Sequence, residues 1–328
     1  MLHIFLNQTA NRGGAGERWR LVEQELQRRA RPYTAHVLQA PGDLDRLLPE
    51  LWTQGARQFA AAGGDGTLQL VVEAVMRHVP GEQRGEIRLG AIGIGTSNDF
   101  HKKGGVRPAA PRTDGQPVVP PHAASSLWNG VPCRLDEAAA HSHDVLELIV
   151  KKPDGTTETH WCLQAVHAGT IPVTNQNLTR GGGWCQWMYG HWYWLSLQMA
   201  AMHTLFSYAG FEAEIEVNSA SISGTFTGMT LLKRCNIAGQ FVFATHRTPN
   251  DGQIDLAACR KVSGWRMIQL IIAFTEQGFA GHPEVEFRET SEVRAQFSAP
   301  QWIDYDGELV QAVEAQVRVL SAALTMLG

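Results

Sequence analysis

The chain has 328 residues, of which 44% are hydrophobic and only 18% are charged. This length predicts about two domains, each large enough to bury a core of its own. The composition excludes a disordered chain, a coiled coil and a histone-like basic protein. Because the formal net charge is −4, no overall positive field attracts nucleic acid, and we expect no nucleic-acid partner.

The charge is distributed unevenly. Residues 1–125 contain 15 Lys and Arg against 12 Asp and Glu, whereas the remainder contains 13 against 20. The first part is therefore mildly receptive to anions and the second is acidic. No apolar run approaches the ~20 residues that span a bilayer, and the five scattered cysteines form no C-x-x-C pair. We therefore expect a protein of the reducing cytoplasm.

Strands and helices alternate in the first part of the chain. Strands are expected at residues 2–6, 34–38, 58–62 and 87–92, and helices at residues 17–30, 44–54 and 68–79. Strands that alternate with helices of about 10–15 residues indicate βαβ units and a parallel sheet. We therefore predict an open α/β domain over residues 1–125.

The pattern changes after a proline-rich segment, Gly104 to Pro121, which contains five of the 15 prolines and marks the expected boundary. Short alternating runs then predict a β-rich second domain over residues 126–328, whose last strand is free to return to the first domain. The expected strands are 145–151, 158–166, 213–217, 225–232, 241–244, 254–258, 285–287, 293–297 and 313–320. Two helical stretches, about 185–208 and 265–277, interrupt them.

Two turns at the ends of expected strands are rich in glycine and carry an Asp: Gly63–Thr67 (GGDGT) and Gly95–Asp99 (GTSND). Ligands of open α/β sheets bind beyond the carboxyl ends of the strands. Glycine lets backbone N–H groups approach phosphate, and the following helix N-terminus adds a favourable dipole. A carboxylate there would repel phosphate unless it holds Mg²⁺ or orients a ribose hydroxyl. Asp65 and Asp99 therefore favour a nucleotide with a metal ion, although Asp also caps helices and glycine also makes tight turns.

The common phosphate-binding and nucleophile motifs are absent from the sequence. It has no G-x-x-x-x-G-K-[ST] loop, no strand-associated G-x-G-x-x-G fingerprint, no protein-kinase catalytic set and no G-x-S-x-G elbow.

Four motifs together resemble the diacylglycerol kinase catalytic family, in its bacterial lipid kinase branch. They are GGDGT at 63–67, GTSNDF at 95–100, DGQID at 251–255 and DGE at 306–308. They occur in that family's order, and the resemblance covers nearly the whole chain. GGDGT alone is similar to turns of NAD kinases and phosphofructokinases, whereas the GT-x-ND-F turn and the late DGE favour lipid kinases. The resemblance implies an NAD kinase/diacylglycerol kinase-like α/β domain, a β-sandwich domain, and an ATP–Mg²⁺ site between them.

The same resemblance implies roles for individual residues. Glu308 matches the family's proton acceptor, with Asp306 beside it, and Asp144 matches another acidic site residue. Asp65 and Asp99 would serve the nucleotide and its catalytic metal. The residues implied to contact ATP are Thr9, Asn11, Arg12, Gly13, Gly64, Asp65, Gly66, Thr67, Thr96, Asn98 and Lys102.

A structural Mg²⁺ is also implied by the resemblance. Its ligands would be the carboxylate of Asp251 and the carbonyls of Thr248 and Gln253, because a turn offers carbonyl oxygens beside the carboxylate.

The sequence departs from the family at several positions. Gln69 and Leu70 replace an Asn and a Glu that usually follow GGDGT, and Lys102 stands where Arg is common. Lys carries a point charge and lacks the fork of Arg, so phosphate contact survives without bidentate geometry. These changes bear on the identity of the lipid and on the efficiency of transfer.

An aromatic block follows the middle of the chain: Trp184, Trp187, Tyr189, Trp192, Tyr193 and Trp194. Such a block is typical either of a membrane-facing patch or of a helix packed on a core, and both interpretations stay open.

The sequence thus predicts an ATP- and Mg²⁺-dependent lipid kinase that phosphorylates a hydroxyl of a diacylglycerol-like lipid. We expect a cytoplasmic protein in peripheral, transient contact with the inner face of the membrane, and a homodimer is left open. The alternatives are an NAD or other small-molecule kinase with a GGDGT turn, and a non-catalytic homologue that binds nucleotide or lipid.

Overall fold

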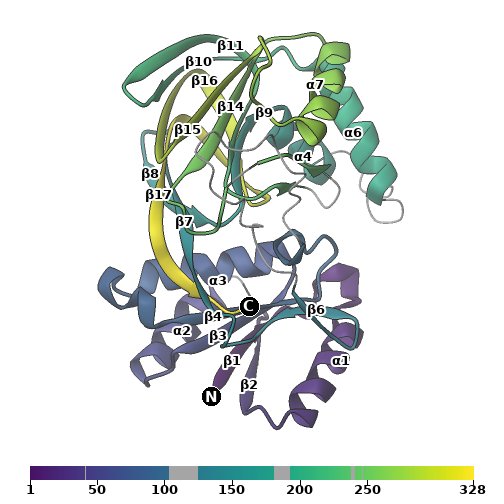
Figure 1. Ribbon diagram of the computed structural model, residues 1–328, viewed down its shortest axis with the longest axis vertical. Helices are drawn as coiled ribbons and strands as arrows, with labels where there is room; N and C mark the ends of the chain where they lie inside the picture. The colour runs from purple at the N-terminus through teal and green to yellow at the C-terminus, as the bar shows by residue number, and fades with distance from the viewer. Residues whose placement is uncertain (41, 103–124, 181–192, 238–240, 246) are drawn as a thin grey trace, which may run out of the picture.

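The computed structural model describes residues 1–40, 42–102, 125–180, 193–237, 241–245 and 247–328. Figure 1 shows an α/β part, which contains the N-terminus, below a part rich in strands. The long strands β7 (His141–Lys151) and β17 (Glu308–Met326) run from one part into the other.

The lower part is built on a parallel sheet in the order β2-β1-β3-β4. Its strands are β1 (Leu2–Leu6), β2 (Tyr33–Val37), β3 (Gln58–Gly63) and β4 (Arg88–Gly93), and its helices are α1 (Ala15–Arg28), α2 (Asp43–Thr53) and α3 (Asp65–His78). Short 3-10 turns lie at Asn11–Gly13, Gly81–Glu86 and Asp99–His101. The predicted alternation of strands and helices is therefore confirmed to within a few residues.

Side chains of β1 alternate between the two faces of this sheet. Ile4 and Leu6 pack with Trp19 of α1 on one face, whereas Phe5 packs with α2 and α3 on the other. Because successive side chains of a strand point to opposite faces, a strand covered by helices on both sides is apolar at most of its positions. Four of the five residues of β1 are apolar and buried, and the exception, His3, is half-buried beside His36 of β2.

The α/β part also includes chain from beyond residue 125. β5 (Ser126–Trp128) pairs with β6 (Val131–Arg134), and β6 pairs antiparallel with β4. The end of β17 lies parallel to β4, where Thr325 pairs with Arg88. The first part thus takes in both a hairpin and the end of the chain.

The upper part consists mainly of antiparallel strands. They are β8 (Thr157–Cys162), β9 (Ala165–Gly169), β10 (Phe211–Val217), β11 (Ala220–Leu232), β14 (Ile254–Arg260), β15 (Val285–Thr290) and β16 (Glu292–Tyr305), with the short pair β12 (Asn236–Ile237) and β13 (Phe241–Val242). Fifteen of the described strands form one hydrogen-bonded network, which is continuous between the two parts through β4 and β17. In β10 every second residue is buried, which is the pattern of a strand with one face on a core.

Three helices lie on one side of the upper part: α4 (Thr170–Arg180), α6 (Tyr193–Ser207) and α7 (Gly264–Glu276). α7 agrees with its prediction, whereas the expected helix at 185–208 is described only from Tyr193 onward. α4 was not expected from the sequence. In the described part of the chain, no helix is long and apolar enough to cross a membrane.

The expected strand at 158–166 is wrong in one respect, because it divides into β8 and β9. The break falls where the backbone N–H groups of Leu163, Gln164 and Ala165 all donate to the carboxylate of Asp306. The backbone N–H groups at this break therefore bind the Asp306 side chain and are not available for pairing between strands.

Candidate functional site

A cavity of about 1020 Å³ lies between the two parts of the molecule. One end is lined by the loops after β1, β3 and β4, and by the turn between β16 and β17. The other end is lined mainly by apolar side chains of α4, α6 and α7 and of the strands beneath them. The cavity thus joins a polar end to an apolar chamber.

The two glycine-rich turns touch each other at the polar end. Both Ile94 and Gly95 donate their backbone N–H to the carbonyl of Gly63, each at 3.0 Å. A Cβ built on Gly95 would lie 2.3 Å from the Cα of Gly64, closer than any side chain tolerates. Glycine is needed here because two backbones meet without room between them.

Asn98 organises the second turn from within. It adopts a left-handed φ of 48°, and its amide Nδ2 donates to the carbonyls of Gly93 and Gly95, each at 3.0 Å. Its Oδ1 accepts the N–H of Gly95 at 3.1 Å. The structure therefore gives this predicted ATP contact a role in shaping the turn.

The loop after β1 lies beside these turns. Asn7 joins it to α3 by donating from Nδ2 to Oγ1 of Thr67 at 3.1 Å, and it also accepts from Thr9. Thr96 donates from its hydroxyl to Oδ1 of Asn11 at 3.4 Å. Asn7, Asn11, Thr67 and Thr96 line the cavity.

Gly13, another predicted contact of this loop, is not among the described residues that line the cavity. Gly13 has a φ of 88° and nothing within 4 Å of a Cβ built on it, and the side chain of Arg12 lies outside the described residues.

Asp65 and Asp99 come together as predicted, at the start of α3 and after β4. Asp65 accepts the backbone N–H groups of Asp99 and Phe100, each at 2.9 Å. Burial and the charge of Asp99 raise the pKa of Asp65, while these N–H groups lower it. Asp99 is buried, and Lys102 donates to its Oδ1 at 2.7 Å. Lys102, predicted at a phosphate, thus pairs with a carboxylate in this structure.

The turn between β16 and β17 closes the polar end from above. Asp306 adopts a left-handed φ of 51° and is fixed by the three N–H groups at the break between β8 and β9. Asp304 is buried and accepts from Asn175 at 2.8 Å and from the N–H of Gly307 at 3.0 Å. Burial raises the pKa of Asp304 to about 6.

Glu308 faces the first glycine-rich turn across the cleft. Its Oε1 lies 3.8 Å from the position that a Cβ on Gly66 would occupy. Desolvation, followed by the charge of Glu73, raises the pKa of Glu308. A carboxylate at the rim of the cavity, next to a turn suited to phosphate, is placed to take a proton from a group that attacks phosphorus.

The polar end carries five carboxyl groups: Asp65, Asp99, Asp304, Asp306 and Glu308. No Lys or Arg occurs among the described residues that line the cavity. The carboxylates of this end favour a polyphosphate that is bound together with a cation. Two cationic side chains lie behind the lining, since Arg18 donates to the carbonyl of Gly95 and Lys102 to Asp99, each at 2.7 Å. The described residues hold no preformed cluster of three or more His, Cys, Asp or Glu side chains for a metal.

Asp144 and Asp251 do not line the cavity and form a separate cluster. Asp144 is fully buried on β7, and the ammonium of Lys233 donates to its Oδ2 at 2.5 Å and to Oδ1 of Asp251 at 2.7 Å. The same ammonium donates to the carbonyl of Gln253 at 3.1 Å, and the N–H of Thr248 donates to Asp251 at 2.9 Å. The position implied for a structural Mg²⁺ is thus filled by a side chain, and these residues do not fit a metal ion.

Sequence reasoning missed several residues of the site. Asp304, near the end of β16, stands two positions before Asp306 of the following turn, and a second Asp so close to a predicted site residue was a usable signal. Asn175 and Lys233 gave no signal, since each acts through a contact with a distant segment.

The departures from the family pattern have different consequences. Gln69 is buried and points away from the cleft, where its amide donates to the carbonyl of Trp161 at 3.1 Å. Leu70 lines the cavity and is 45% exposed. An apolar side chain thus replaces a carboxylate at the cleft.

The predicted aromatic block lies outside the described residues. This applies to Trp184, Trp187, Tyr189 and Trp192, and to the side chains of Tyr193 and Trp194.

Comparison with known proteins confirms the resemblance inferred from the motifs. Residues 1–119 match the family model of the diacylglycerol kinase catalytic domain. A relative from Pseudomonas aeruginosa, named "Probable lipid kinase YegS-like", is 39% identical over 82 residues, which are 24% of this chain and 26% of that protein. A protein of the same name from Xanthomonas euvesicatoria is 27% identical over 144 residues, 44% of this chain and 39% of that one. The alignments therefore span about a quarter to two fifths of these curated relatives.

The fold is shared over a longer stretch than the sequence. A crystal structure of a diacylglycerol kinase from Bacillus anthracis covers 99% of this chain and 96% of its own, with a TM-score of 0.66 and 15% identity. The combination of an α/β N-terminal part with a strand-rich C-terminal part is therefore common to both chains.

Proposed function

We propose that the protein is a lipid kinase, which uses ATP and Mg²⁺ to phosphorylate a hydroxyl of a diacylglycerol-like lipid. One observation carries the proposal: a single cavity joins two glycine-rich turns and Glu308 to an apolar chamber. Reagents of opposite character, a nucleotide and a lipid, would meet where the two ends join.

The polar end supplies what a nucleotide needs. Gly64 and Gly95 bring two backbones together, and the N-terminus of α3, which has no side-chain cap, would present its positive dipole end to phosphate oxygens. When bound, Mg²⁺ would neutralise charge on the phosphates, and Asp65 and Asp99 are the carboxylates nearest to hold it. Asp65 also ties the two turns to each other, so the phosphate site would form as one unit.

The proton of the acceptor hydroxyl would pass to Glu308. As the new phosphorus–oxygen bond forms, the bond to the leaving ADP oxygen breaks and the hydroxyl proton moves to the Glu308 carboxylate. Asp306 would not touch the substrate; its three N–H bonds fix the turn that carries Glu308.

The apolar end favours a lipid over a soluble acceptor. Its lining includes Leu178, Leu197, Met202, Leu205, Ile271 and Phe274. Acyl chains would be buried favourably against such side chains, by roughly 0.8 kcal/mol for each CH₂ removed from water. A soluble acceptor such as NAD or a sugar phosphate would leave this chamber unfilled.

Access to the lipid fits a peripheral membrane contact. Met202 and Ile272 line the cavity and are also 43% and 55% exposed, so apolar lining continues to the surface at α6 and α7. We therefore place the reaction at the inner face of a membrane, with the protein entering and leaving from the cytoplasm.

The test is an assay of phosphoryl transfer from labelled ATP, in Mg²⁺, to a panel of diacylglycerols, other lipid alcohols, NAD and sugar phosphates. We expect transfer to a lipid and about a 10²–10⁴-fold loss in Glu308→Gln with unchanged ATP binding. Transfer to a soluble acceptor alone would support the small-molecule kinase. Tight ATP binding by calorimetry with no transfer to any acceptor would support the non-catalytic homologue.

A further inference from the structure

The side chain of Lys233 is completely buried in a cluster of carboxylates and carbonyls. Lys233 follows the end of β11 and its side chain has 0% exposure, as has that of Asp144. Its ammonium reaches Asp144, Asp251 and the carbonyl of Gln253, at 2.5, 2.7 and 3.1 Å. A primary ammonium has three N–H donors, and here three oxygens accept them.

The carboxylates around Lys233 are completed by backbone donors. Asp144 also accepts the N–H of Gly252 and of Ala322, each at 2.8 Å, so that it joins the 248–253 turn to β17. Asp251 accepts the N–H of Gln253 at 3.0 Å. These bonds hold the two carboxylates in place, so that one oxygen of each accepts from the Lys233 ammonium.

We infer that the Lys233 ammonium is the resident cation of this cluster and stands where a structural divalent metal would otherwise sit. Two of the three groups implied as metal ligands, the Asp251 carboxylate and the Gln253 carbonyl, are bound to it. Mg²⁺ needs about six oxygens at about 2.0–2.1 Å, and the ammonium among these oxygens excludes it. The turn at 248–253 is therefore held to β7 without metal.

A second cationic side chain, Arg247, lies beside the cluster but does not pair with Asp144. The neighbouring Arg247 is buried and pairs with Asp255 at 3.0 Å, while its other nitrogens face Asp251 and Glu289. Among the described residues, the Lys233 ammonium is therefore the charge that offsets the buried Asp144 carboxylate. Removing it would leave that buried carboxylate beside Asp251 without an opposite charge, which is strongly unfavourable.

The test measures the thermal midpoint, Tm, of the nucleotide-free protein in EDTA and in Mg²⁺. We expect the same Mg²⁺-induced shift in the wild type and in Asp251→Asn, because Mg²⁺ does not bind at Asp251. A larger shift in the wild type than in Asp251→Asn would overturn the inference. This comparison decides the question even where Lys233 variants fail to fold.

The Lys233→Ala variant adds a second measurement. We expect its Tm in EDTA to fall by about 10 °C, and Mg²⁺ to restore part of the loss by occupying the vacated place. Lys152→Ala is the matched control, because Lys152 pairs with Glu158 at 2.9 Å but is partly exposed; it should lose less than about 3 °C. A loss in Lys233→Ala no greater than in the control, or no recovery in Mg²⁺, would overturn the inference.

Discussion

In the proposed function, the two single residues Glu308 and Gly66 would define the point of reaction. Glu308 begins β17, so its position depends on the left-handed turn of Asp306, and Gly66 leaves the space that its carboxylate faces. Any side chain at residue 66 would stand between the carboxylate and a phosphate bound at the turn. The two residues are far apart in the chain, and together they would leave a space between the Glu308 carboxylate and the first glycine-rich turn, in which the acceptor hydroxyl could lie.

The charge environment of Glu308 predicts a pH dependence. Glu308 must be ionised to accept a proton, so kcat/KM falls as the pH drops through its pKa. Desolvation and the charge of Glu73 raise that pKa, which moves the acid limb to higher pH. Glu73→Gln removes one of these causes while keeping an oxygen for His160, which lies 3.1 Å from Glu73. We expect the acid limb to move to lower pH.

The measurement is kcat/KM for the lipid as a function of pH, with Glu50→Gln as the control. Glu50 is an exposed residue of α2, and its substitution should leave the limb in place. A limb that stays fixed in Glu73→Gln, or moves to higher pH, would contradict the assignment of Glu308 as the proton acceptor.

Residues of the site differ in how far the sequence reveals them. Asp65, Asp99 and Glu308 stand in glycine-containing turns at strand ends, and the ends of neighbouring strands meet at one edge, so their approach was predictable. Lys233 was not, because its partner Asp144 is 89 residues away and an isolated Lys at a strand end is usually solvated. Its burial depends on the packing of three segments that are distant in the sequence: the end of β11, β7 and the turn at 248–253.

At the scale of elements, α4 shows why local pattern failed. Its sequence, TIPVTNQNLTR, contains Pro, Thr and Asn, which are poor helix formers, and only three large apolar side chains. Tertiary contacts hold it: Asn175 donates to Asp304, and Asn177 donates to Thr204 of α6 at 3.2 Å. The long strand β17 was likewise expected only in part, because its end passes from one part of the molecule to the other, where it pairs with β4.

The end of α1 gives a prediction at this scale. Ala30 has a φ of 48°, and the N–H groups of Ala30 and Arg31 donate to the carbonyls of Gln27 and Leu26, the pattern of a Schellman cap. A side chain in the left-handed region costs about 1–2 kcal/mol. We expect Ala30→Gly to raise the free energy of unfolding by about 1 kcal/mol, measured by urea denaturation.

A matched substitution separates this effect from the general cost of glycine. Ala200 lies inside α6, where Ala200→Gly should lower the free energy of unfolding by about 1 kcal/mol. If Ala30→Gly lowers the free energy of unfolding by a similar amount, the left-handed conformation of Ala30 does not destabilise the protein, and the prediction is wrong.

At the scale of the whole molecule, the cavity exists because the chain crosses between its two parts more than once. β7 and β17 pair with each other along most of their length, and β17 ends beside β4. The turn between β16 and β17, which carries the carboxylates, and the glycine-rich turns after β3 and β4 are therefore carried by strands of one continuous sheet. Because these strands are hydrogen-bonded to one another, Glu308 would keep its position opposite the first glycine-rich turn. The helices around the apolar end could then adjust to a lipid without moving the two apart.

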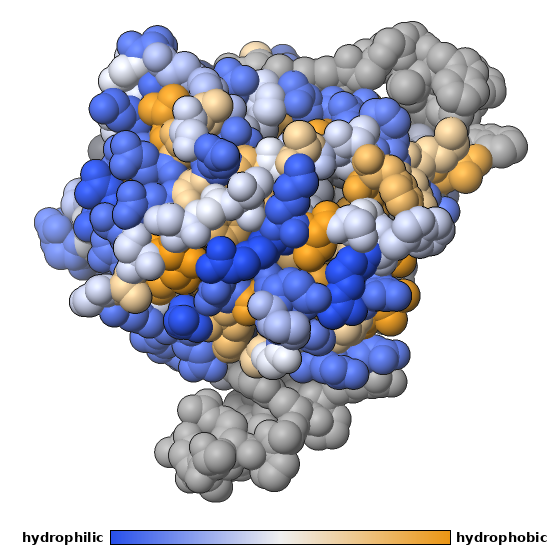
Figure 2. Space-filling view, turned by 90° about the horizontal axis from the view of Figure 1, so that it is seen from above, coloured by the Kyte–Doolittle hydropathy of each residue, from blue (hydrophilic) through white to orange (hydrophobic). Residues whose placement is uncertain are grey.

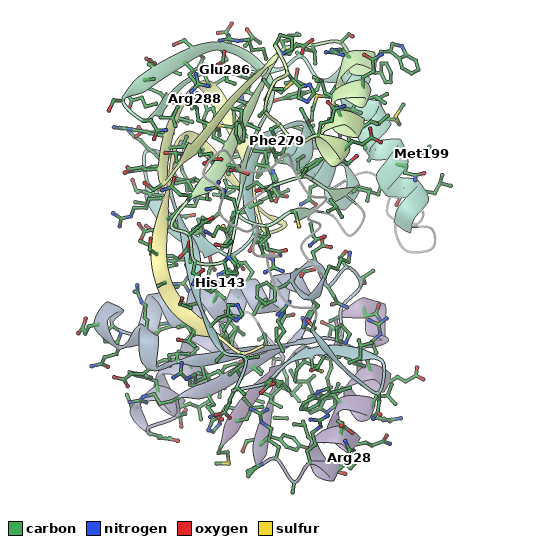
Figure 3. The ribbon with its side chains drawn as sticks, viewed as in Figure 1. Arg28, His143, Met199, Phe279, Glu286 and Arg288 are labelled. Carbon is green, nitrogen blue, oxygen red and sulfur yellow. The ribbon has the colours of Figure 1, made fainter. Side chains whose placement is uncertain are left out.

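The outer face of α6 and α7 is apolar and exposed, and we expect it to touch the membrane. Phe206 and Trp265 lie in contact, with ring centroids 5.2 Å apart, and are 50% and 69% exposed. Apolar side chains gather on the side of the molecule on which these helices lie (Figure 2), and Met199 lies on the outer side of α6 (Figure 3). Large exposed apolar patches of this kind mark interaction surfaces, and aromatic side chains suit the membrane interface.

Vesicle co-sedimentation tests this surface. Partial burial of two aromatic side chains contributes roughly 1 kcal/mol each, so the double variant Phe206→Ser, Trp265→Ser should bind vesicles about tenfold or more weakly. Leu127→Ser is the control, because Leu127 is also 69% exposed but belongs to β5 of the α/β part. Since the chain carries a net charge of −4, neutral and anionic vesicles should bind about equally. Equal losses in the double variant and the control, or binding that requires anionic lipid, would show that another surface makes the contact.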